Sequence, residues 1–113
     1  MPNINLQTNL TLDKATAEEL KAMLGKAIET LPGKTEQWLM VELTGDVNMC
    51  FGGKNDPCAL VHVELLGKAT EGVYAKMTAL LTEKLSAKLG IAPDRIYVKY
   101  SEYPLWGWNG INL

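Results

Sequence analysis

The centre of the chain carries an apolar run that ends at a glycine, Ala59-Leu60-Val61-His62-Val63-Glu64-Leu65-Leu66-Gly67. Its β-branched residues and its short length between turn residues predict a strand. Side chains alternate between the two faces of a strand, so Val61 and Val63 point to one side. Leu60 and Leu66 point to the other side. We therefore expect this strand to be apolar on both faces, as in sheets that are covered on both sides.

A helix and a second strand follow this run. The helix is predicted from about Glu71 to Leu89, with Gly90 as its C-cap, because apolar residues recur there at helical spacing. Its apolar face carries Tyr74, Met77, Leu81, Leu85 and Leu89. Residues 96–100 predict a returning strand, which completes one strand–helix–strand unit.

The first half of the chain repeats this order. A strand opens at Pro2 with apolar and polar residues in alternation, and a helix follows the N-cap signal of residues 11–13. Pro32-Gly33 end that helix, and residues 38–43 predict a mostly buried second strand. A constant offset along the chain aligns Leu31 with Leu89, Glu36 with Asp94 and Met40 with Val98. The sequence therefore predicts two copies of one βαβ unit.

This organisation predicts the architecture. Strands joined through a helix lie parallel with right-handed crossovers, so both helices should cover the same face of a four-stranded sheet. We expect an α+β two-layer sandwich in one domain, residues 1–113, with pseudo-repeats at about 2–46 and 58–101 and a C-terminal tail at 102–113. The other face lacks a cover, so we expect a homo-oligomer in which sheets pack on each other. The tail could add a short edge strand to a neighbouring copy.

Composition and charge exclude several classes of function. With Lys+Arg at 11 and Asp+Glu at 13, the net charge is -2, so no basic field exists to bind nucleic acid. No segment is apolar enough to insert into a membrane, and residues 1–6 show no signal peptide, so we expect a cytoplasmic location. The chain has 2 cysteines, too few for a disulfide framework. The spacing of these cysteines and of the 1 histidine favours no metal site.

The common catalytic motifs are missing as well. The chain has no Gly-x-Ser-x-Gly, no phosphate-binding glycine loop and no His-Glu-x-x-His. The single histidine, His62, lies in the middle of a predicted strand, which is typical of a packing position. What remains is Pro2. If Met1 is removed, Pro2 presents a secondary amine at the start of a strand, held by the sheet instead of fraying.

A set of short motifs runs along the whole chain: Met1-Pro2, Gly33-Lys34, Phe51-Gly52-Gly53 with Pro57-Cys58-Ala59-Leu60, Gly67-Lys68, Pro93-Asp94-Arg95-Ile96-Tyr97 and Gly107-Trp108-Asn109. In these motifs and their order the chain resembles the macrophage migration inhibitory factor (MIF) family of the tautomerase superfamily. The resemblance implies a βαββαβ protomer with a C-terminal strand. It also implies a homotrimer built around a barrel of three sheets, which agrees with the uncovered sheet face.

The resemblance implies an isomerase that needs no cofactor. Its reaction would be the keto–enol tautomerisation of phenylpyruvate-like 2-oxo acids and dopachrome-type compounds, in active sites at the subunit interfaces. Pro2 matches the proline whose nitrogen is the general base. An α-amino group titrates at about pH 8, and an apolar pocket with neighbouring cations lowers its pKa, so such a base is poised near neutrality.

The resemblance also gives the chain a candidate site, residue by residue. Lys34 matches a lysine that binds the substrate carboxylate and steadies enolate charge. Leu66 matches a residue whose backbone contacts the substrate, and Tyr97 matches a tyrosine from an adjacent subunit; for both, the alternative is plain strand packing. The apolar end of the pocket, where aromatic faces hold the substrate ring, is matched by Trp106, Trp108 and Leu113.

Three positions depart from the family pattern. Lys99 stands where the best-known members have asparagine. If it points into the pocket it is a second substrate-binding cation that favours dianionic or strongly acidic substrates, and if it points outward it is an ordinary surface lysine. Trp106 replaces a smaller residue and should narrow the pocket against bulky hydroxyphenyl substrates. Cys58 lacks the second cysteine of Cys-x-x-Cys, so no thiol–disulfide activity is expected.

Two alternatives to the tautomerase remain open. One is a cytokine-like immunomodulatory protein that is exported without a signal peptide and binds a cell-surface receptor, with tautomerase activity vestigial or secondary. An acetylated N-terminus, or one that retains Met1, would favour this alternative. The other is an inactive structural homologue.

Overall fold

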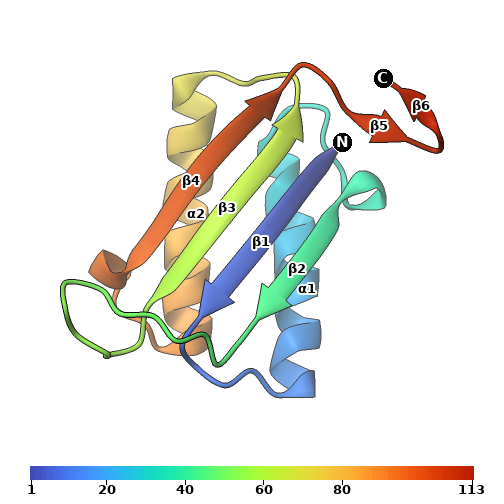
Figure 1. Ribbon diagram of the computed structural model, residues 1–113. Coiled ribbons are helices and arrows are strands. Elements are labelled where there is room, and N and C mark those ends of the chain that lie inside the picture. Colours follow the sequence, from blue (N-terminus) through green and yellow to red (C-terminus); the bar gives the residue numbers. More distant parts are fainter.

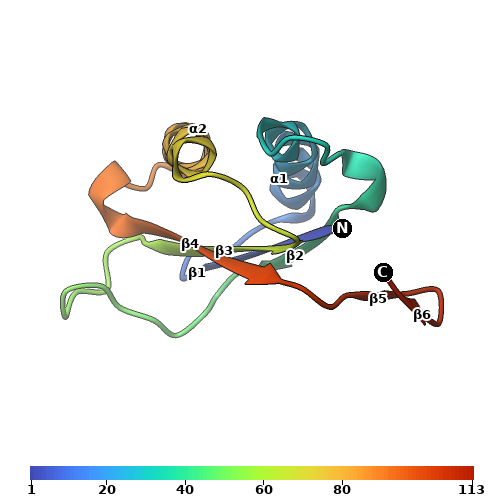
Figure 2. The ribbon, with the colours of Figure 1, turned by 90° about the horizontal axis from the view of Figure 1, so that it is seen from above.

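The computed structural model describes residues 1–113 and places two helices on one face of a four-stranded sheet (Figures 1 and 2). The sheet strands are β1 (Pro2–Thr8), β2 (Met40–Thr44), β3 (Ala59–Leu66) and β4 (Ile96–Tyr103), and the helices are α1 (Lys14–Ala27) and α2 (Glu71–Leu89). Three short 3-10 helices are η1 (Ile28–Thr30), η2 (Glu36–Trp38) and η3 (Pro93–Arg95), and a small hairpin is formed by β5 (Gly107–Trp108) and β6 (Ile111–Asn112). None of the helices is both long and apolar enough to span a bilayer.

The order of strands in the sheet is β2-β1-β3-β4. β1 pairs with β2 in parallel, and β3 pairs with β4 in parallel, because a helix joins the two strands within each unit. The two units meet at the centre of the sheet, where β1 and β3 run antiparallel. The predicted α+β sandwich of two βαβ units, with both helices on one face, is therefore confirmed.

One end of each helix follows its local sequence signal, whereas α1 ends at Ala27, before the predicted Pro32-Gly33, and continues as η1 to Thr30. The Asp13 side chain accepts a hydrogen bond from the backbone N–H of Thr16 at 2.7 Å, as an N-cap does. Gly90 ends α2 with a φ of 69°, a left-handed conformation that a residue with a Cβ adopts at a cost. The predicted bounds of the second helix and its C-cap are thus confirmed.

The core lies between the sheet and the helices. Alternate residues of β1 and β3 are buried there, together with the inward faces of α1 and α2. The largest fully buried side chains are Ile4, Leu6, Leu20, Leu24, Ile28, Leu31, Leu65, Met77, Leu81, Leu85, Ile91 and Val61. Of the face predicted for α2, Met77, Leu81 and Leu85 are buried, whereas Tyr74 and Leu89 are half-buried at its margins.

The opposite face of the sheet, called here the open face, is more polar than we expected from Leu60 and Leu66. The alternation in β3 turns Val61 and Val63 toward the helices, so the residues between the two leucines on the open face are His62 and Glu64. The neighbouring strand β1 adds Asn3, Asn5 and Gln7. The expectation of a strand that is apolar on both faces was wrong, because only its ends carry leucine on this side.

The second strand also differs from the prediction. It begins at Met40, because Trp38 closes the η2 turn and Leu39 caps it. It is not mostly buried, since β2 lies at an edge of the sheet and no residue of it is buried. The strand predicted to end at Tyr100 continues to Tyr103, because its pairing with β3 extends as far as Leu66.

A test of the core is the variant Leu81→Ala. The side chain of Leu81 is fully buried, so its truncation should lower the free energy of unfolding by about 2–5 kcal/mol, measured by urea denaturation. The matched control on the same helix is Lys84→Ala, whose exposed side chain should matter by no more than about 0.5 kcal/mol. Equal effects of the two substitutions would contradict the packing described above.

Candidate active site

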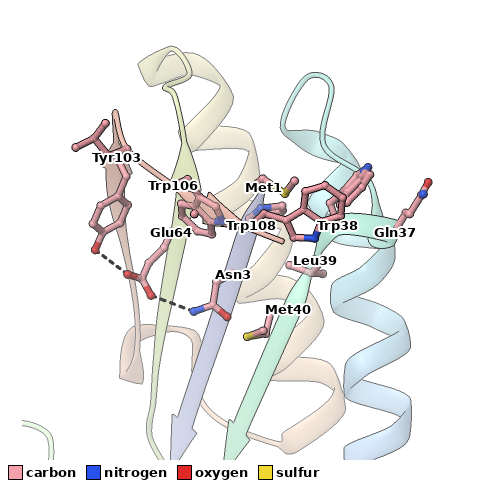
Figure 3. Close-up of a pocket in the computed structure, with 13 residues that line it drawn as sticks. Met1, Asn3, Gln37, Trp38, Leu39, Met40, Glu64, Tyr103, Trp106 and Trp108 are labelled. Carbon is pink, nitrogen blue, oxygen red and sulfur yellow. Dashed lines mark hydrogen bonds between the residues drawn. The ribbon is translucent and has the colours of Figure 1, made fainter. Parts of the chain in front are cut away.

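A cavity of about 660 Å³ lies where the start of β1, the η2 turn and the C-terminal hairpin meet (Figure 3). Its lining residues are Met1, Pro2, Asn3, Gln37, Trp38, Leu39, Met40, Glu64, Tyr103, Leu105, Trp106, Gly107 and Trp108. Of these 13 residues 8 are hydrophobic, so the cavity is a mainly apolar space with a few polar groups, as is usual for a small-molecule site.

The sheet holds the start of the chain in place. Pro2 is buried, and it pairs opposite Leu65 in the antiparallel ladder. The carbonyl of Met1 accepts a hydrogen bond from the backbone N–H of Leu66 at 3.0 Å. The first two residues are therefore part of the sheet and line the cavity from a fixed position.

A lysine lies beside the N-terminal amine. The Lys34 Nζ donates a hydrogen bond to the carbonyl of Leu66 at 3.0 Å, which holds its charge near the first residue of the chain. The pKa of the Met1 amine is lowered, first by burial and then by the charge of Lys34 and a hydrogen bond with it. Both causes penalise a second cation here, so an amine at this end of the sheet loses its proton more readily.

Aromatic rings form much of the cavity wall. Trp38 and Trp108 meet edge to face with ring centroids 5.1 Å apart, and Tyr103 and Trp106 meet in the same way at 5.9 Å. The C-terminal hairpin brings Trp108 to Trp38. Its turn is Asn109-Gly110, and both residues have a positive φ, as a two-residue hairpin turn requires.

One carboxylate lines the cavity. Glu64 accepts hydrogen bonds from the Tyr103 hydroxyl at 2.7 Å and from the Asn3 Nδ2 at 3.0 Å (Figure 3). The pKa of Glu64 is lowered, and the largest cause is the hydrogen bond from Tyr103. Glu64 is therefore an ionised carboxylate at neutral pH, in a fixed orientation.

The structure brings some of the predicted site residues together. Pro2, Trp106 and Trp108 line the cavity directly. Lys34 and Leu66 are not among its lining residues, but they contact the N-terminal residue that is. The side chain of Leu113 is 45% exposed outside the cavity, and its backbone N–H donates to the carbonyl of Trp106 at 2.9 Å.

Tyr97 and Lys99 lie away from the cavity of their own chain. Tyr97 pairs opposite Leu60, which pairs opposite Gln7, so Tyr97 is at the far end of the sheet from Pro2. Lys99 is exposed on the open face, opposite His62. In a single chain Lys99 therefore points outward, as a surface lysine does, and not into the cavity of its own chain.

The sequence analysis missed Trp38, Glu64 and Tyr103 as cavity residues. Glu64 could have been found, because it lies two residues before Leu66 in one strand and so shares its face. Trp38 follows Lys34 closely in the same turn region, but the strand predicted over residues 38–43 obscured it. Tyr103 lies beyond the predicted end of its strand, and no local signal marks it.

Comparison with known proteins agrees with the fold. The structure superposes on the crystal structure of Leishmania major MIF2 with a TM-score of 0.92, at 29% identity, covering 100% of this chain and 97% of that one. A MIF homologue from Prochlorococcus marinus superposes with a TM-score of 0.81 at 30% identity, covering 97% of each chain. The fold is thus that of MIF-type proteins.

Sequence comparison identifies the family. The family model for macrophage migration inhibitory factor matches residues 1–113. Mouse macrophage migration inhibitory factor is 34% identical over 115 aligned positions, covering 97% of this chain and 96% of the mouse protein. Chicken D-dopachrome decarboxylase is 29% identical over 113 positions, covering 96% and 90%. The chain belongs to the macrophage migration inhibitory factor family.

The role of Lys34 can be tested through the pKa of the N-terminal amine. The variant Lys34→Ala removes a cation beside the amine, so the protonated form is less penalised and the pKa should rise toward that of an ordinary terminal amine. An NMR titration of the labelled first residue measures this pKa directly. The matched control is Lys68→Ala, an exposed lysine that is not among the causes of the shift. A pKa unchanged by Lys34→Ala would contradict the electrostatic coupling.

Proposed function

We propose that the protein is a cofactor-independent tautomerase for phenylpyruvate-like 2-oxo acids and dopachrome-type compounds, with Pro2 as general base once Met1 has been removed. The observation that carries the proposal is the buried Pro2 at the wall of a mainly apolar cavity, with Lys34 beside the start of the chain. Membership of the MIF family, which includes a chicken relative named D-dopachrome decarboxylase, supports it.

The proposed proton transfer uses two groups, the Pro2 nitrogen and the Lys34 ammonium. The neutral Pro2 nitrogen takes a proton from the carbon next to the keto group, and the electron pair of that C–H bond moves onto the carbonyl oxygen as an enolate. The Lys34 ammonium binds the carboxylate and stabilises the developing negative charge. The proton then goes to the enolate oxygen, so the enol forms and the amine returns to its neutral state. Burial and Lys34 favour that neutral state, as the lowered pKa of the terminal amine illustrates.

The aromatic wall suits the ring of such a substrate. Trp106 and Trp108 offer ring faces and edges to a phenyl or indole group. Leu66 contributes its backbone, whose carbonyl already binds Lys34, and Leu113 closes the hairpin that carries both tryptophans. The bulk of Trp106 favours slim aromatic 2-oxo acids over bulky hydroxyphenyl ones.

We also propose a homotrimer with active sites at the interfaces. Tyr97 lies at the far end of its own sheet from Pro2, so it reaches a Pro2 only if it belongs to a neighbouring copy, and Lys99 does not line the cavity of its own chain either. Tyr97 is 62% exposed in a single chain, which is consistent with a role at such an interface. Lys99 would then add a second cation for an acidic substrate.

A second candidate rests on the name of the mouse relative, macrophage migration inhibitory factor. In this alternative the protein binds a cell-surface receptor, and the cavity is secondary. The two candidates separate in one variant: a receptor-mediated effect on macrophage migration would survive Pro2→Gly, whereas turnover would not.

The test of the tautomerase is phenylpyruvate turnover by the wild-type protein and by Pro2→Gly, on samples whose intact mass shows that Met1 is absent. We expect kcat/KM to fall by about 100-fold, because glycine loses the ring that fixes the nitrogen against the sheet. The matched control is Pro93→Gly, which removes an exposed proline from the η3 turn. Processed wild-type protein without turnover, or full turnover in Pro2→Gly, would sink the proposal.

A further inference from the structure

The cavity contains a charge that the tautomerase mechanism does not use. Glu64 carries the one charged side chain among its lining residues. Lys34, which the mechanism needs for an anionic substrate, lies outside that lining, beside the terminal amine. A carboxylate repels the carboxylate of a 2-oxo acid, so its presence here requires a different explanation.

The Glu64 carboxylate is built into the site. Tyr103 donates to its Oε2 at 2.7 Å, and Asn3 donates to its Oε1 at 3.0 Å. Both donors are themselves lining residues, so the carboxylate is oriented from two strands at the cavity wall (Figure 3). Neither donor is a cation, and Glu64 forms no salt bridge within the chain. Its negative charge has no ion-pair partner within the chain, and only His62 and Lys99 act on it through charge, as minor causes of its lowered pKa.

The surrounding rings have the matching chemistry. Trp38, Trp106, Trp108 and Tyr103 line the same space as Glu64. The faces of aromatic rings attract cations, and an ammonium group bound among several rings and a carboxylate gains from both interactions. A neutral hydroxyl of the same size gains neither charge interaction.

We propose that Glu64 and the aromatic rings around it form a subsite for an ammonium group, so that the cavity selects aromatic ligands that carry a protonated amine. This inference extends the proposed function, since it assigns a substrate with two opposite charges. Its 2-oxo carboxylate would lie toward Lys34 and its amine toward Glu64. Phenylpyruvate would then be a simpler analogue of the preferred substrate, because it carries the 2-oxo carboxylate but no ammonium group.

The test is binding of two ligands of similar size, phenethylamine and 2-phenylethanol, measured by isothermal titration calorimetry at neutral pH on protein lacking Met1. We expect the wild-type protein to bind the amine about tenfold more tightly than the alcohol. This comparison needs no variant, so it tests the subsite even if a substitution impairs folding. Equal affinities, or a preference for the alcohol, would overturn the proposal.

Two matched variants then locate the charge. Glu64→Gln should abolish the preference for the amine. Glu42→Gln should keep it, because Glu42 also accepts a hydrogen bond from Asn3, at 3.1 Å, but does not line the cavity. A preference that survives Glu64→Gln, or that is lost equally in both variants, would refute the subsite. Binding is measured without turnover, so the two proposals can fail separately. A protein that prefers the amine but does not turn over phenylpyruvate would refute the proposed tautomerase activity and leave the ammonium subsite standing.

Discussion

Backbone pairing of β1 on both of its sides is the interaction on which the site depends. β1 is bonded to β2 along one side and to β3 along the other, so the beginning of the chain lies inside the sheet and not at its edge. Buried backbone groups must find hydrogen-bond partners, and this requirement holds Met1 and Pro2 in the ladder. A terminal amine is usually mobile and fully hydrated. In this fold it is fixed, partly buried and close to a lysine.

The alternation of β1 and β3 separates two environments with one sheet. Ile4, Val61 and Val63 pack under the helices, whereas Asn3 and Glu64 on the same strands turn toward the open face and the cavity. The strands that line the cavity are therefore fixed by the apolar core, while the side chains that they present to the cavity are polar. The C-terminal hairpin completes it with tryptophans, which supply a large apolar surface at little cost in side-chain entropy.

Sequence signals predicted most of the fold, because the signals are local. Asp13 caps α1 and Gly90 ends α2 through contacts within a few residues, so the sequence is sufficient to place them. The prediction failed where a distant partner decides. Trp38 turns toward Trp108, and β4 continues to Tyr103 because Leu66 pairs with it. The residues around Trp38 give no signal that the hairpin at the other end of the chain will pack against it. The resemblance assigned Tyr97 to the site of an adjacent subunit, and this stays a prediction, since a single chain shows only that Tyr97 lies at the far end of its own sheet from Pro2.

The central position of β1 has a consequence for any extension of the chain. Residues added before Pro2 begin inside the cavity, as Met1 itself does, because β3 holds the backbone of Met1 and Pro2 at the cavity wall. An affinity tag or a fused protein at this end would thus start within the binding space. The other terminus begins outside the cavity lining, since Leu113 follows the outer hairpin and is exposed (Figure 1). A label or immobilisation linker at the C-terminus therefore starts outside the cavity, and a flexible spacer after Leu113 keeps it away from the hairpin that carries Trp106 and Trp108.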